Sequence, residues 1–597
     1  MALAKGESIA AHVQYPLLGA TISWTPGVQL TTQRTFDPAE DLYLCDHTLG
    51  RAVSEDDPDL RALAVMPLTM SLEILAEAAA CLMSGDTVVR MEEIKAFRWI
   101  AFDGLPQVLR MTARRAPDSR NRVIVQIRNL TEDAESADPL KSPVIEATVV
   151  VAVAYSMPPA VQALSLENQR PSHWRPGHLY DDAMFHGPRW QGVARMEHTG
   201  DNGAVASLLV LPFGDFFASS IEPRFVLDPV VLDAAGQVIG FWTMERLATG
   251  KLIFPYRVTS LELYGPQRPE GELIGCIASI ELVGQQQVRS TIDMVDGDGR
   301  LWMRLVEWED KRFELPGHFY DLLLSVRAAE IAADWPALLA HLEQPQHYAC
   351  RATTGVFPSD QAFWKRVWAN CILSRQEREV FRQLGTPESR QLSWLAGRAA
   401  AKQAVRQVVR AHYGRDLLPA DISIIADSHG RPVVGGAWTV TVPVVPTVSI
   451  SHTGDYAVAL AGLAPNTPRV GIDVEQMREC PPNFVELVLT AEEQRHLEQL
   501  PLAERDEWVL RCWCAKEALA KACGYGLVEG PHSIEILEVN ATSQRVIARP
   551  VGELARRMSD TVHSGYIVHT GRYDSLVAAT TVAECVGERM AISTRSW

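Results

Sequence analysis

The first half of the chain alternates hydrophobic and polar residues over short stretches. Residues 122–130 (RVIVQIRNL), 143–155 and 203–213 place an apolar side chain at nearly every second position. Because successive side chains of a strand point to opposite faces, such a stretch can pack one face against a core. The pattern predicts that the first half is rich in strands.

Two longer apolar segments interrupt these strands and have the period of a helix. Residues 66–85 and 228–250 each begin near a proline, repeat apolar positions at helical spacing and end at a glycine. The order of strands, helix and strands occurs once around each segment. We therefore expect a doubled unit in which each helix lies against a curved sheet.

The second half alternates helices and strands. Residues 317–346 predict a helical connector broken by Pro336. The predicted helices at 393–414 and 508–526 both carry basic residues along one side and end in an aromatic residue and glycine, which suggests an internal repeat. The pattern predicts an α+β protein with domains at 1–315 and 346–597 and a helical linker at 316–345.

The composition narrows the class of protein. A chain of 597 residues is too long for one core, and 47% hydrophobic with 22% charged residues is ordinary for a soluble protein. A net charge of −17 disfavours a nucleic-acid partner, although a local basic pocket for a small anion remains compatible with it. No apolar run has the length of a membrane span, the start lacks a signal-peptide core, and the ten cysteines form no C-x-x-C pair. We expect a cytoplasmic protein with reduced thiols and no membrane partner.

Two acidic residues in the second half stand on alternate positions. In the sequence VGIDVE, a strand would point Asp473 and Glu475 to the same face. Adjacent carboxylates repel each other unless a cation lies between them, and their oxygens suit Mg²⁺. Glu517 lies on the second predicted helix, flanked by Lys516 and Lys521. When the two acids are considered alone, a solvated edge strand is the simpler explanation.

The motifs around these acids occur in a specific order. SISHTGDYAVA, GIDVE and WCAKEALAKACGYGL follow one another, with WLAGRAAAK and SHGRPVV upstream. Together they resemble the Sfp-type 4′-phosphopantetheinyl transferases over nearly the whole second domain. The resemblance implies a pseudo-twofold α/β domain that binds coenzyme A and Mg²⁺ between its halves. Such a domain transfers the phosphopantetheine arm of coenzyme A to a serine of an acyl carrier protein.

The resemblance also implies residue roles. Asp473, Glu475 and Glu517 match the metal-binding acids, and Glu517 matches the proposed base for the serine hydroxyl. The residues implied or considered for the coenzyme A pocket are His452, Arg431 and Lys521, and less securely Arg398, Lys402 and Lys516. Asp574-Ser575-Leu576 imitates a carrier attachment site, but it lies in a β-branched run near the end of the chain. We predict that it begins a closing strand of the transferase.

In the first half, His47 and Asp233 come from the two repeats and meet at one tunnel if the repeats pack as pseudo-twins. A lone histidine or helix aspartate is more often structural, so this pairing depends on the surrounding motifs. YPLLGATISWTPG, YLCDHTLG, VMPLTMSLEILAEAAA, LYDDAMFHGPRWQGV and DPVVLDAAGQ occur in the order seen in polyketide synthase dehydratase domains. The resemblance covers residues 1–315 and implies a double hotdog fold.

In this family His47 would be the base at the α-carbon and Asp233 the acid at the departing hydroxyl. Gln237, one helical turn further on, would orient the hydroxyl or Asp233, and a backbone N–H near Gly50 would polarise the thioester carbonyl. The chain departs from the family at His186, where a tyrosine is usual before Gly-Pro, and at an apparent insertion in residues 51–64. These departures leave the carbonyl-binding geometry open.

Together, the two halves resemble the C-terminal dehydratase–transferase part of an iterative polyketide or polyunsaturated-fatty-acid-like synthase. We expect a piece of a larger megasynthase, with a free-standing subunit as the alternative. The expected partners are acyl carrier domains of the same or a partner synthase, and a homodimer is a candidate because hotdog domains often pair. Alternatives for the first domain are an inactive docking or dimerisation platform and a product-template-like cyclase.

Overall fold

The computed structural model of the chain contains two compact units. It describes the following residues: 15–134, 142–219, 223–247, 251–314, 317–341, 347–354, 361–385, 387–463, 470–558 and 565–582. The first unit spans residues 1–51 and 61–324, and the second spans residues 52–60 and 325–597. The division falls inside the predicted linker, and the short segment 52–60 belongs with the second unit.

Two helices form the centre of the first unit, as the apolar periodicity predicts. α2 runs from Leu68 to Leu82 after Pro67, and α5 runs from Pro229 to Arg246. The carboxylate of Asp228 accepts a hydrogen bond from the backbone N–H of Val231 and thereby caps α5. Nearly every α2 side chain is buried, which matches a helix enclosed by a sheet.

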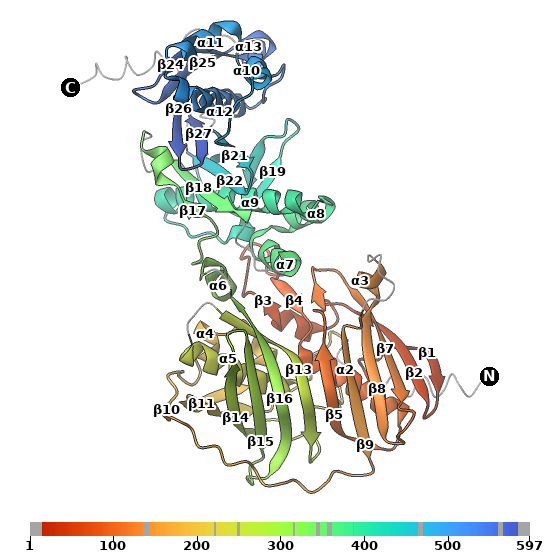
Figure 1. Cartoon of the computed structure of the whole chain (residues 1–597). Helices are drawn as coiled ribbons and strands as arrows, with labels where there is room; N and C mark the ends of the chain where they lie inside the picture. The colour runs from red at the N-terminus through yellow and green to blue at the C-terminus, as the bar shows by residue number, and fades with distance from the viewer. Residues whose placement is uncertain are drawn as a thin grey trace. The chain divides into compact units, whose positions relative to one another are not determined.

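One continuous 13-stranded sheet surrounds these helices (Figure 1). Its first half is, in spatial order, β1 (Ala20–Thr25), β2 (Gln29–Phe36), β7 (Gln107–Arg115), β8 (Arg122–Asn129), β9 (Ile145–Ala152) and β5 (Thr87–Ala96). Its second half is β13 (Lys251–Leu263), β16 (Leu301–Glu314), β15 (Gln287–Val295), β14 (Leu273–Val283), β12 (Gly203–Leu209), β11 (Val193–Gly200) and β10 (Arg170–Pro171). β5 pairs antiparallel with β13, which joins the halves into a double hotdog.

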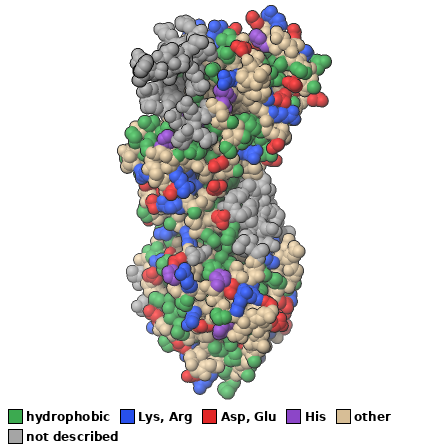
Figure 2. Space-filling view, turned by 90° about the vertical axis from the view of Figure 1, so that its left-hand side faces the viewer, with side chains coloured by type: hydrophobic (Ala, Val, Ile, Leu, Met, Phe, Trp, Pro, Cys, Tyr) green, Lys and Arg blue, Asp and Glu red, His purple; other side chains and the backbone are tan. Residues whose placement is uncertain are grey.

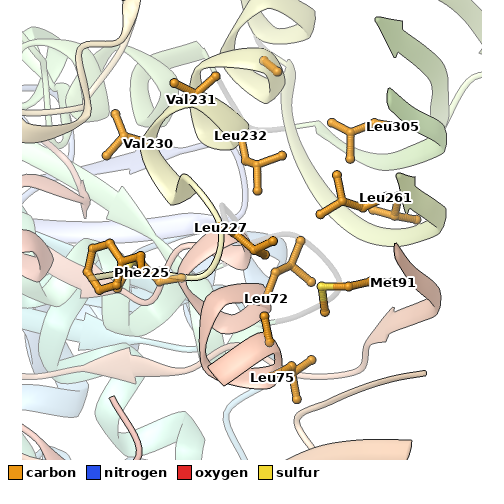
Figure 3. Close-up of a cluster of buried hydrophobic side chains, with 14 of the residues drawn as sticks. Leu72, Leu75, Met91, Phe225, Leu227, Val230, Val231, Leu232, Leu261 and Leu305 are labelled. Carbon is orange, nitrogen blue, oxygen red and sulfur yellow. The ribbon is translucent and has the colours of Figure 1, made fainter. Parts of the chain in front are cut away.

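The two halves share one hydrophobic core. In Figure 3, Leu72 and Leu75 of α2 lie near Leu227, just before α5, and Met91 of β5 and Leu261 of β13 lie beside them. All five side chains are at most 1% exposed. Side chains from both repeats therefore exclude water at the seam where the halves meet.

Smaller elements complete the first unit, and some of them carry residues of the site. These are η1 (Leu42–Asp46), β3 (Thr48–Leu49), β4 (Leu63–Val65), β6 (Ala101–Phe102), α3 (Leu130–Ala134), α4 (Leu179–Asp182), η2 (Pro188–Trp190) and α6 (Gly317–Leu324). β3, β4 and β6 form a separate three-stranded sheet. This sheet follows His47 in the sequence and fixes the backbone on which that residue lies.

The second unit is built from two sheets, each packed against one long helix. The first sheet contains β17 (Ala333–Asp334), β18 (His347–Thr353), β22 (Tyr456–Gly462) and β21 (Thr447–Thr453), with α9 (Glu388–Tyr413) packed on it. The second contains β23 (Gly471–Gln476), β27 (Leu576–Thr581), β26 (Tyr566–Tyr573), β25 (Arg545–Pro550) and β24 (Ile534–Asn540), with α12 (Arg505–Cys523) packed on it. Both helices end at a glycine in the left-handed conformation, Gly414 and Gly524.

Shorter elements complete the second unit. They are the β19–β20 hairpin (Ser423–Ala426 and Pro432–Gly435), α7 (Gln361–Ile372), α8 (Arg375–Gln383), α10 (Pro482–Val488), α11 (Ala491–Glu498), α13 (Gly552–Arg557) and η3 (Pro336–Leu339). β27 begins at Leu576, directly after Asp574 and Ser575, so the carrier-like motif starts a closing strand as predicted.

The prediction of a helical connector at 316–345 is only partly correct. α6 ends at Leu324, and the chain then forms β17, which pairs with β18, and η3, which begins at Pro336. Proline lacks a backbone N–H and cannot continue a helix, and the sheet of the second unit supplies partners for the extended residues. The rest of the predicted connector therefore belongs to the second unit.

One face of the molecule shows how its charged side chains are distributed. On the face that Figure 2 shows, basic and acidic side chains are interspersed in both units. No helix among the described residues is long and apolar enough to cross a membrane.

Candidate active sites

The first unit brings His47 and Asp233 to one site, as the paired repeats predict. His47 follows η1, whereas Asp233 lies on the second turn of α5. The Nδ1 atom of His47 lies 2.7 Å from the carbonyl oxygen of Val65. A carbonyl can only accept, so Nδ1 carries the proton and Nε2 keeps a free lone pair.

Burial acts on these two residues in opposite directions. It lowers the pKa of His47, although the neighbouring Asp233 carboxylate opposes that shift. It raises the pKa of Asp233, although His47 and Gln237 oppose that shift. Both shifts favour the neutral form of the group, so the site is suited to an imidazole base and a protonated carboxyl acid.

Gln237 fixes the orientation of Asp233. Its Nε2 atom donates to Asp233 Oδ2 at 2.7 Å and to the carbonyl oxygen of Trp190 at 2.7 Å, and its Oε1 accepts from the Tyr180 hydroxyl at 2.5 Å. The Tyr180 hydroxyl in turn accepts from the backbone N–H of Val193 at 2.9 Å. Of the two roles considered for Gln237, the geometry supports the one in which it orients Asp233.

The loop that carries His186 is tied to the segment that carries His47. Asp46 accepts from the backbone N–H of Arg189 at 3.1 Å and from its guanidinium at 2.9 Å, and the backbone N–H of Gly187 donates to the Asp46 carbonyl at 2.7 Å. A Cβ atom at Gly187 would lie 2.6 Å from the Asp46 carboxyl carbon. Glycine at position 187 is therefore needed for this close approach.

This contact places His186 beside the two predicted catalytic residues. Its Nε2 lies 3.5 Å from Asp233 Oδ2, and its ring centroid lies 5.1 Å from that of His47. Burial, and then His47, lower the pKa of His186 well below its ordinary value, so the ring is neutral. Position 186 is marked in the sequence only by its departure from the family pattern, and nothing there indicates its proximity to Asp233.

The prediction that a backbone N–H near Gly50 binds a thioester carbonyl depends on whether that N–H is free. The N–H of Gly50 itself donates to the carbonyl oxygen of Thr48 at 3.0 Å. That donor is already paired, so Gly50 does not offer it to a ligand in this conformation. Binding of the carbonyl by a backbone N–H near Gly50 stays a prediction.

In the second unit, β23 points Asp473 and Glu475 toward α12. Asp473 is 5% exposed, and its Oδ1 accepts from Ser451 Oγ and from Lys521 Nζ, each at 2.7 Å. Its Oδ2 atom is buried and has no hydrogen-bond partner among the described residues. Glu475 Oε1 accepts from Trp513 Nε1 at 2.9 Å. An unpaired buried carboxylate oxygen is a position where a cation would be stabilised.

The three acids influence one another electrostatically. Burial raises the pKa of Glu475, and Asp473 adds to that rise. Burial likewise raises the pKa of Glu517, where Lys521 opposes the shift and Asp473 and Glu475 add to it. Within the described part of the chain, the acids do not form a set whose ligand atoms all lie within 4.8 Å of one another. Their oxygen donors and mutual repulsion fit a divalent cation, and the ammonium group of Lys521 already binds one of them, Asp473.

His452 lies on β21, directly after Ser451, whose hydroxyl binds Asp473. A Cβ atom at Gly397 of α9 would overlap its ring, so glycine allows the imidazole to pack on the helix. Loss of water contact, and then the cations Lys521 and Arg398, lower the pKa of His452 to about 4. His452 is therefore neutral at neutral pH and can meet a phosphate only through a hydrogen bond, whereas Arg398, which lies over the Trp394 ring, is a cation.

Arg431 lies at the tip of the β19–β20 hairpin. Its guanidinium pairs with Asp427 at 2.9 Å, and its side chain remains 41% exposed. His429 of the same turn contacts the ring of Tyr525, two residues beyond α12, at 5.7 Å between centroids. The hairpin thus places a basic side chain near the end of α12, the helix that carries Glu517 and Lys521.

Burial contradicts the prediction that Lys402 and Lys516 contact coenzyme A. Both side chains are completely buried. Lys402 Nζ binds Glu377 at 2.5 Å and the carbonyl oxygens of Ile372 and Pro419 at 2.6 Å and 3.0 Å. Lys516 Nζ binds Glu493 and the Val488 carbonyl oxygen, each at 2.9 Å. The Lys402 ammonium group uses all its donors on buried acceptors, and the Lys516 ammonium group uses two of its donors in the same way. Neither lysine therefore reaches a phosphate.

Comparison with known proteins finds the family predicted for each half of the chain. Residues 469–574 match the 4′-phosphopantetheinyl transferase superfamily, and residues 159–315 match the polyketide synthase dehydratase N-terminal domain. The holo-[acyl-carrier-protein] synthase of Geobacillus kaustophilus is 41% identical over 103 residues, which are 16% of this chain and 74% of that protein. The corresponding synthase of Bacillus pumilus is 42% identical over 88 residues, 15% of this chain and 69% of that protein.

Solved structures of dehydratase domains are similar to part of the chain. The dehydratase domain of PpsC from Mycobacterium tuberculosis is 22% identical, with a TM-score of 0.38, and the match covers 50% of this chain and 99% of that domain. The dehydratase match in sequence includes Asp233, and the transferase match includes Asp473, Glu475 and Glu517. The chain thus joins a polyketide synthase-type dehydratase domain to a transferase domain, and it belongs to the 4′-phosphopantetheinyl transferase superfamily.

Proposed function

We propose that the chain converts apo acyl carrier protein to its holo form and dehydrates β-hydroxyacyl thioesters held by such carriers. The observation that carries this proposal is the meeting of His47 and Asp233 from separate halves of one domain, in a chain that also contains a transferase. A carrier can hold a thioester only after such a transferase has attached the phosphopantetheine arm. The two activities therefore have one common partner, an acyl carrier domain of the same or a partner synthase.

In the dehydratase unit, the free Nε2 lone pair of His47 removes a proton from the α-carbon of the thioester. The electrons of that C–H bond form the double bond between the α- and β-carbons, and the bond from the β-carbon to oxygen breaks. Protonated Asp233 gives its proton to the leaving oxygen, which departs as water. Gln237 holds the Asp233 carboxyl during this transfer through its 2.7 Å hydrogen bond.

In the transferase unit, we propose that Asp473, Glu475 and Glu517 hold Mg²⁺. The fit is supported by the unpaired buried Oδ2 of Asp473 and by the repulsion among the three carboxyls. When bound, a divalent ion supplies positive charge to the diphosphate oxygens of coenzyme A. The partly buried Glu517 carboxylate would accept the proton of the carrier serine, directly or through water.

The remaining residues of the transferase site bind and orient coenzyme A. We propose that Arg398, Arg431 and Lys521 pair with its phosphates as cations and that neutral His452 contributes a hydrogen bond. The carrier serine oxygen attacks the phosphorus atom that bears the pantetheine arm. The phosphoanhydride bond breaks, and adenosine 3′,5′-bisphosphate leaves with the negative charge.

The dehydratase proposal is tested with a carrier that already bears a 3-hydroxyacyl arm, so the result does not depend on the transferase. Incubation with the full chain should give a carrier lighter by one water molecule. His47→Phe and Asp233→Asn should give no such loss, whereas His178→Phe, at an exposed histidine of the same unit, should behave like the unaltered protein. Equal water loss by all four proteins would remove His47 and Asp233 from the catalytic step. No water loss with the unaltered protein would support the docking-platform alternative.

A further inference from the structure

The structure assigns a transition-metal site to the dehydratase unit: we propose that His47, His186 and Asp233 bind a divalent ion of the Zn²⁺ class. These residues offer one ligand atom each, and the three atoms all lie within 4.8 Å of one another. No other set of three such side chains in the described ranges meets this criterion. Two imidazoles and one carboxylate are a donor set typical of zinc sites that keep one position open.

The distances suit a small tetrahedral ion. Zinc–ligand bonds of about 2.0 Å place neighbouring ligand atoms roughly 3.3 Å apart in a tetrahedron. His186 Nε2 and Asp233 Oδ2 are already 3.5 Å apart. The third ligand comes from His47, whose Nδ1 is engaged by the Val65 carbonyl oxygen, so Nε2 is the atom that faces the site. Only a small movement of these side chains would therefore complete the coordination.

The neighbours of two ligands orient them as metal sites require. A metal-bound histidine usually donates its second N–H to a carbonyl or carboxylate, as His47 donates to Val65. A metal-bound carboxylate is usually hydrogen-bonded as well, as Asp233 is by Gln237 at 2.7 Å. Both arrangements exist without any ion, so the ligand orientation is built into the fold.

His186 supplies the independent sign of a ligand. The residue is only 9% exposed, and its Nδ1 has no hydrogen-bond partner within the described structure. Its Nε2 lies 3.5 Å from Asp233, which is longer than an ordinary hydrogen bond. A buried polar ring that makes no short hydrogen bond is costly unless it has another partner. Nε2, which faces Asp233 and makes no short hydrogen bond, is the nitrogen available to a metal ion, whereas Nδ1 is not a ligand atom and carries the proton.

The consequence for catalysis rests on the proposed dehydration. An ion at this site would take the Nε2 lone pair with which His47 removes the substrate proton, so zinc should inhibit dehydration reversibly. Mg²⁺ prefers oxygen ligands and would not compete for two imidazoles. The chain would thus use Mg²⁺ in its transferase unit while excluding Mg²⁺ from its dehydratase unit.

The test uses Co²⁺ as a spectroscopic probe of the full-length chain. The Asp473→Asn/Glu475→Gln double variant serves as the background, to remove the proposed oxygen site of the transferase. Four-coordinate cobalt bound by imidazole gives a strong visible absorption band, whereas six-coordinate cobalt bound by oxygen gives a weak one. We expect the strong band to saturate at one equivalent of Co²⁺. Added Zn²⁺ should displace the cobalt and remove the band, and added Mg²⁺ should leave the band unchanged.

Variants at two histidines decide whether the band arises at this site. His186→Phe keeps a ring that can stack on Phe185, as His186 does at 4.6 Å, and should abolish the band. His178→Phe removes an exposed histidine paired with Asp181 and should retain the band. Thermal unfolding of each variant shows whether the first unit remains folded, and His186→Gln provides a second variant if His186→Phe does not.

Each outcome has a clear meaning. A weak band alone, or a strong band that survives in the folded His186 variants, would overturn the proposal. A strong band lost with His186 supports it even if the chain never dehydrates a thioester. Dehydration without the band would leave the proposed function intact and refute the metal site, so the two hypotheses can fail separately.

Discussion

At the scale of single residues, burial adjusts two titrating groups in opposite directions at one site. His47 and Asp233 both lie where water is largely excluded, and each is pushed toward its neutral form. Both shifts act toward an unionised acid beside an unionised base, the pair that elimination of water requires. His186 adds a third neutral group that the dehydration step does not use.

The pH dependence of dehydration should show both shifts. The base fails once His47 is protonated, and its lowered pKa moves this acidic limit below the ordinary histidine value of about 6.5. The acid fails once Asp233 loses its proton, and its raised pKa moves the alkaline limit above the ordinary aspartate value of about 3.9. A profile of kcat/KM against pH on a carrier-bound 3-hydroxyacyl thioester measures both limits. An activity that rises steadily with increasing alkalinity would contradict these roles.

His452 should contribute to coenzyme A binding without a pH signature. Its pKa of about 4 means that the ring gains its charge only in acid, so it is neutral throughout the range from about 6 to 8. His452→Ala should raise the KM for coenzyme A by about tenfold, the value of one hydrogen bond of ~1.4 kcal/mol. The ratio to the unaltered protein should stay constant with pH over that range.

The control for this measurement is His532→Ala, because His532 is an exposed histidine of the same unit. A His452→Ala effect that grows steeply between pH 8 and pH 6 would show that the imidazolium, rather than the imidazole, binds the phosphate. An unchanged KM would remove His452 from the coenzyme A site.

At the scale of secondary-structure elements, the transferase unit contains the same buried glutamate–lysine ion pair twice. Glu377 completes a capping box at the start of α8 and binds Lys402 of α9, and Glu493 completes a capping box at the start of α11 and binds Lys516 of α12. Each glutamate also accepts a backbone N–H from a neighbouring segment, at Ile424 and Ile536. The two halves of the unit therefore share a buried ion pair as well as the helix layout that suggested an internal repeat.

Removing either buried lysine should destabilise the second unit strongly. Lys402→Met or Lys516→Met leaves a glutamate buried without its cation, which costs about 3–5 kcal/mol in comparable pairs. Arg556→Met, which removes an exposed partner of Glu553, should cost less than about 1 kcal/mol. Chemical denaturation followed by far-ultraviolet circular dichroism measures all three. A cost below about 1 kcal/mol for both lysine variants would show that these pairs do not support the fold.

The sequence predicts elements well where one periodic pattern decides them. α2, α5, α9 and α12 follow helical spacing between start and stop residues, and the alternation in β23 places Asp473 and Glu475 on one face. It fails where distant segments decide the outcome. Lysines at helical spacing look like surface residues, and only the fold reveals Glu377 and Glu493 in the interior. Likewise, residues 333–334 pair as a strand because β18 offers an edge.

At the scale of the whole molecule, a segment within the dehydratase sequence is part of the transferase unit. Residues 52–60 belong to the second unit, where Asp421 accepts hydrogen bonds from the Ser54 hydroxyl and from the backbone N–H of Glu55 at 3.2 Å. Arg375 binds Asp57 through two hydrogen bonds of 2.8 Å. The stretch that looks like an insertion in the sequence therefore has a structural role outside the domain that contains it.

Breaking these contacts should affect the second unit selectively. Ser54→Ala removes a buried donor to Asp421 and should lower the unfolding free energy of that unit by about 1–2 kcal/mol. Asp57→Asn weakens an exposed pair and should cost less than about 1 kcal/mol. Calorimetry of the full chain measures this effect on the unfolding transition of the second unit. That transition is identified as the one whose temperature Lys402→Met also lowers. A Ser54→Ala variant that leaves this transition unchanged would show that the segment does not stabilise the unit.

The most direct test of the central claim is the intact mass of an apo acyl carrier protein after incubation with the full chain, coenzyme A and Mg²⁺. The account predicts that the carrier gains the mass of one phosphopantetheine arm. It also predicts no gain with Glu517→Gln and a gain with Glu538→Gln, a matched change outside the site on β24. No gain with the unaltered protein across several carriers, or an equal gain with Glu517→Gln, would contradict the account.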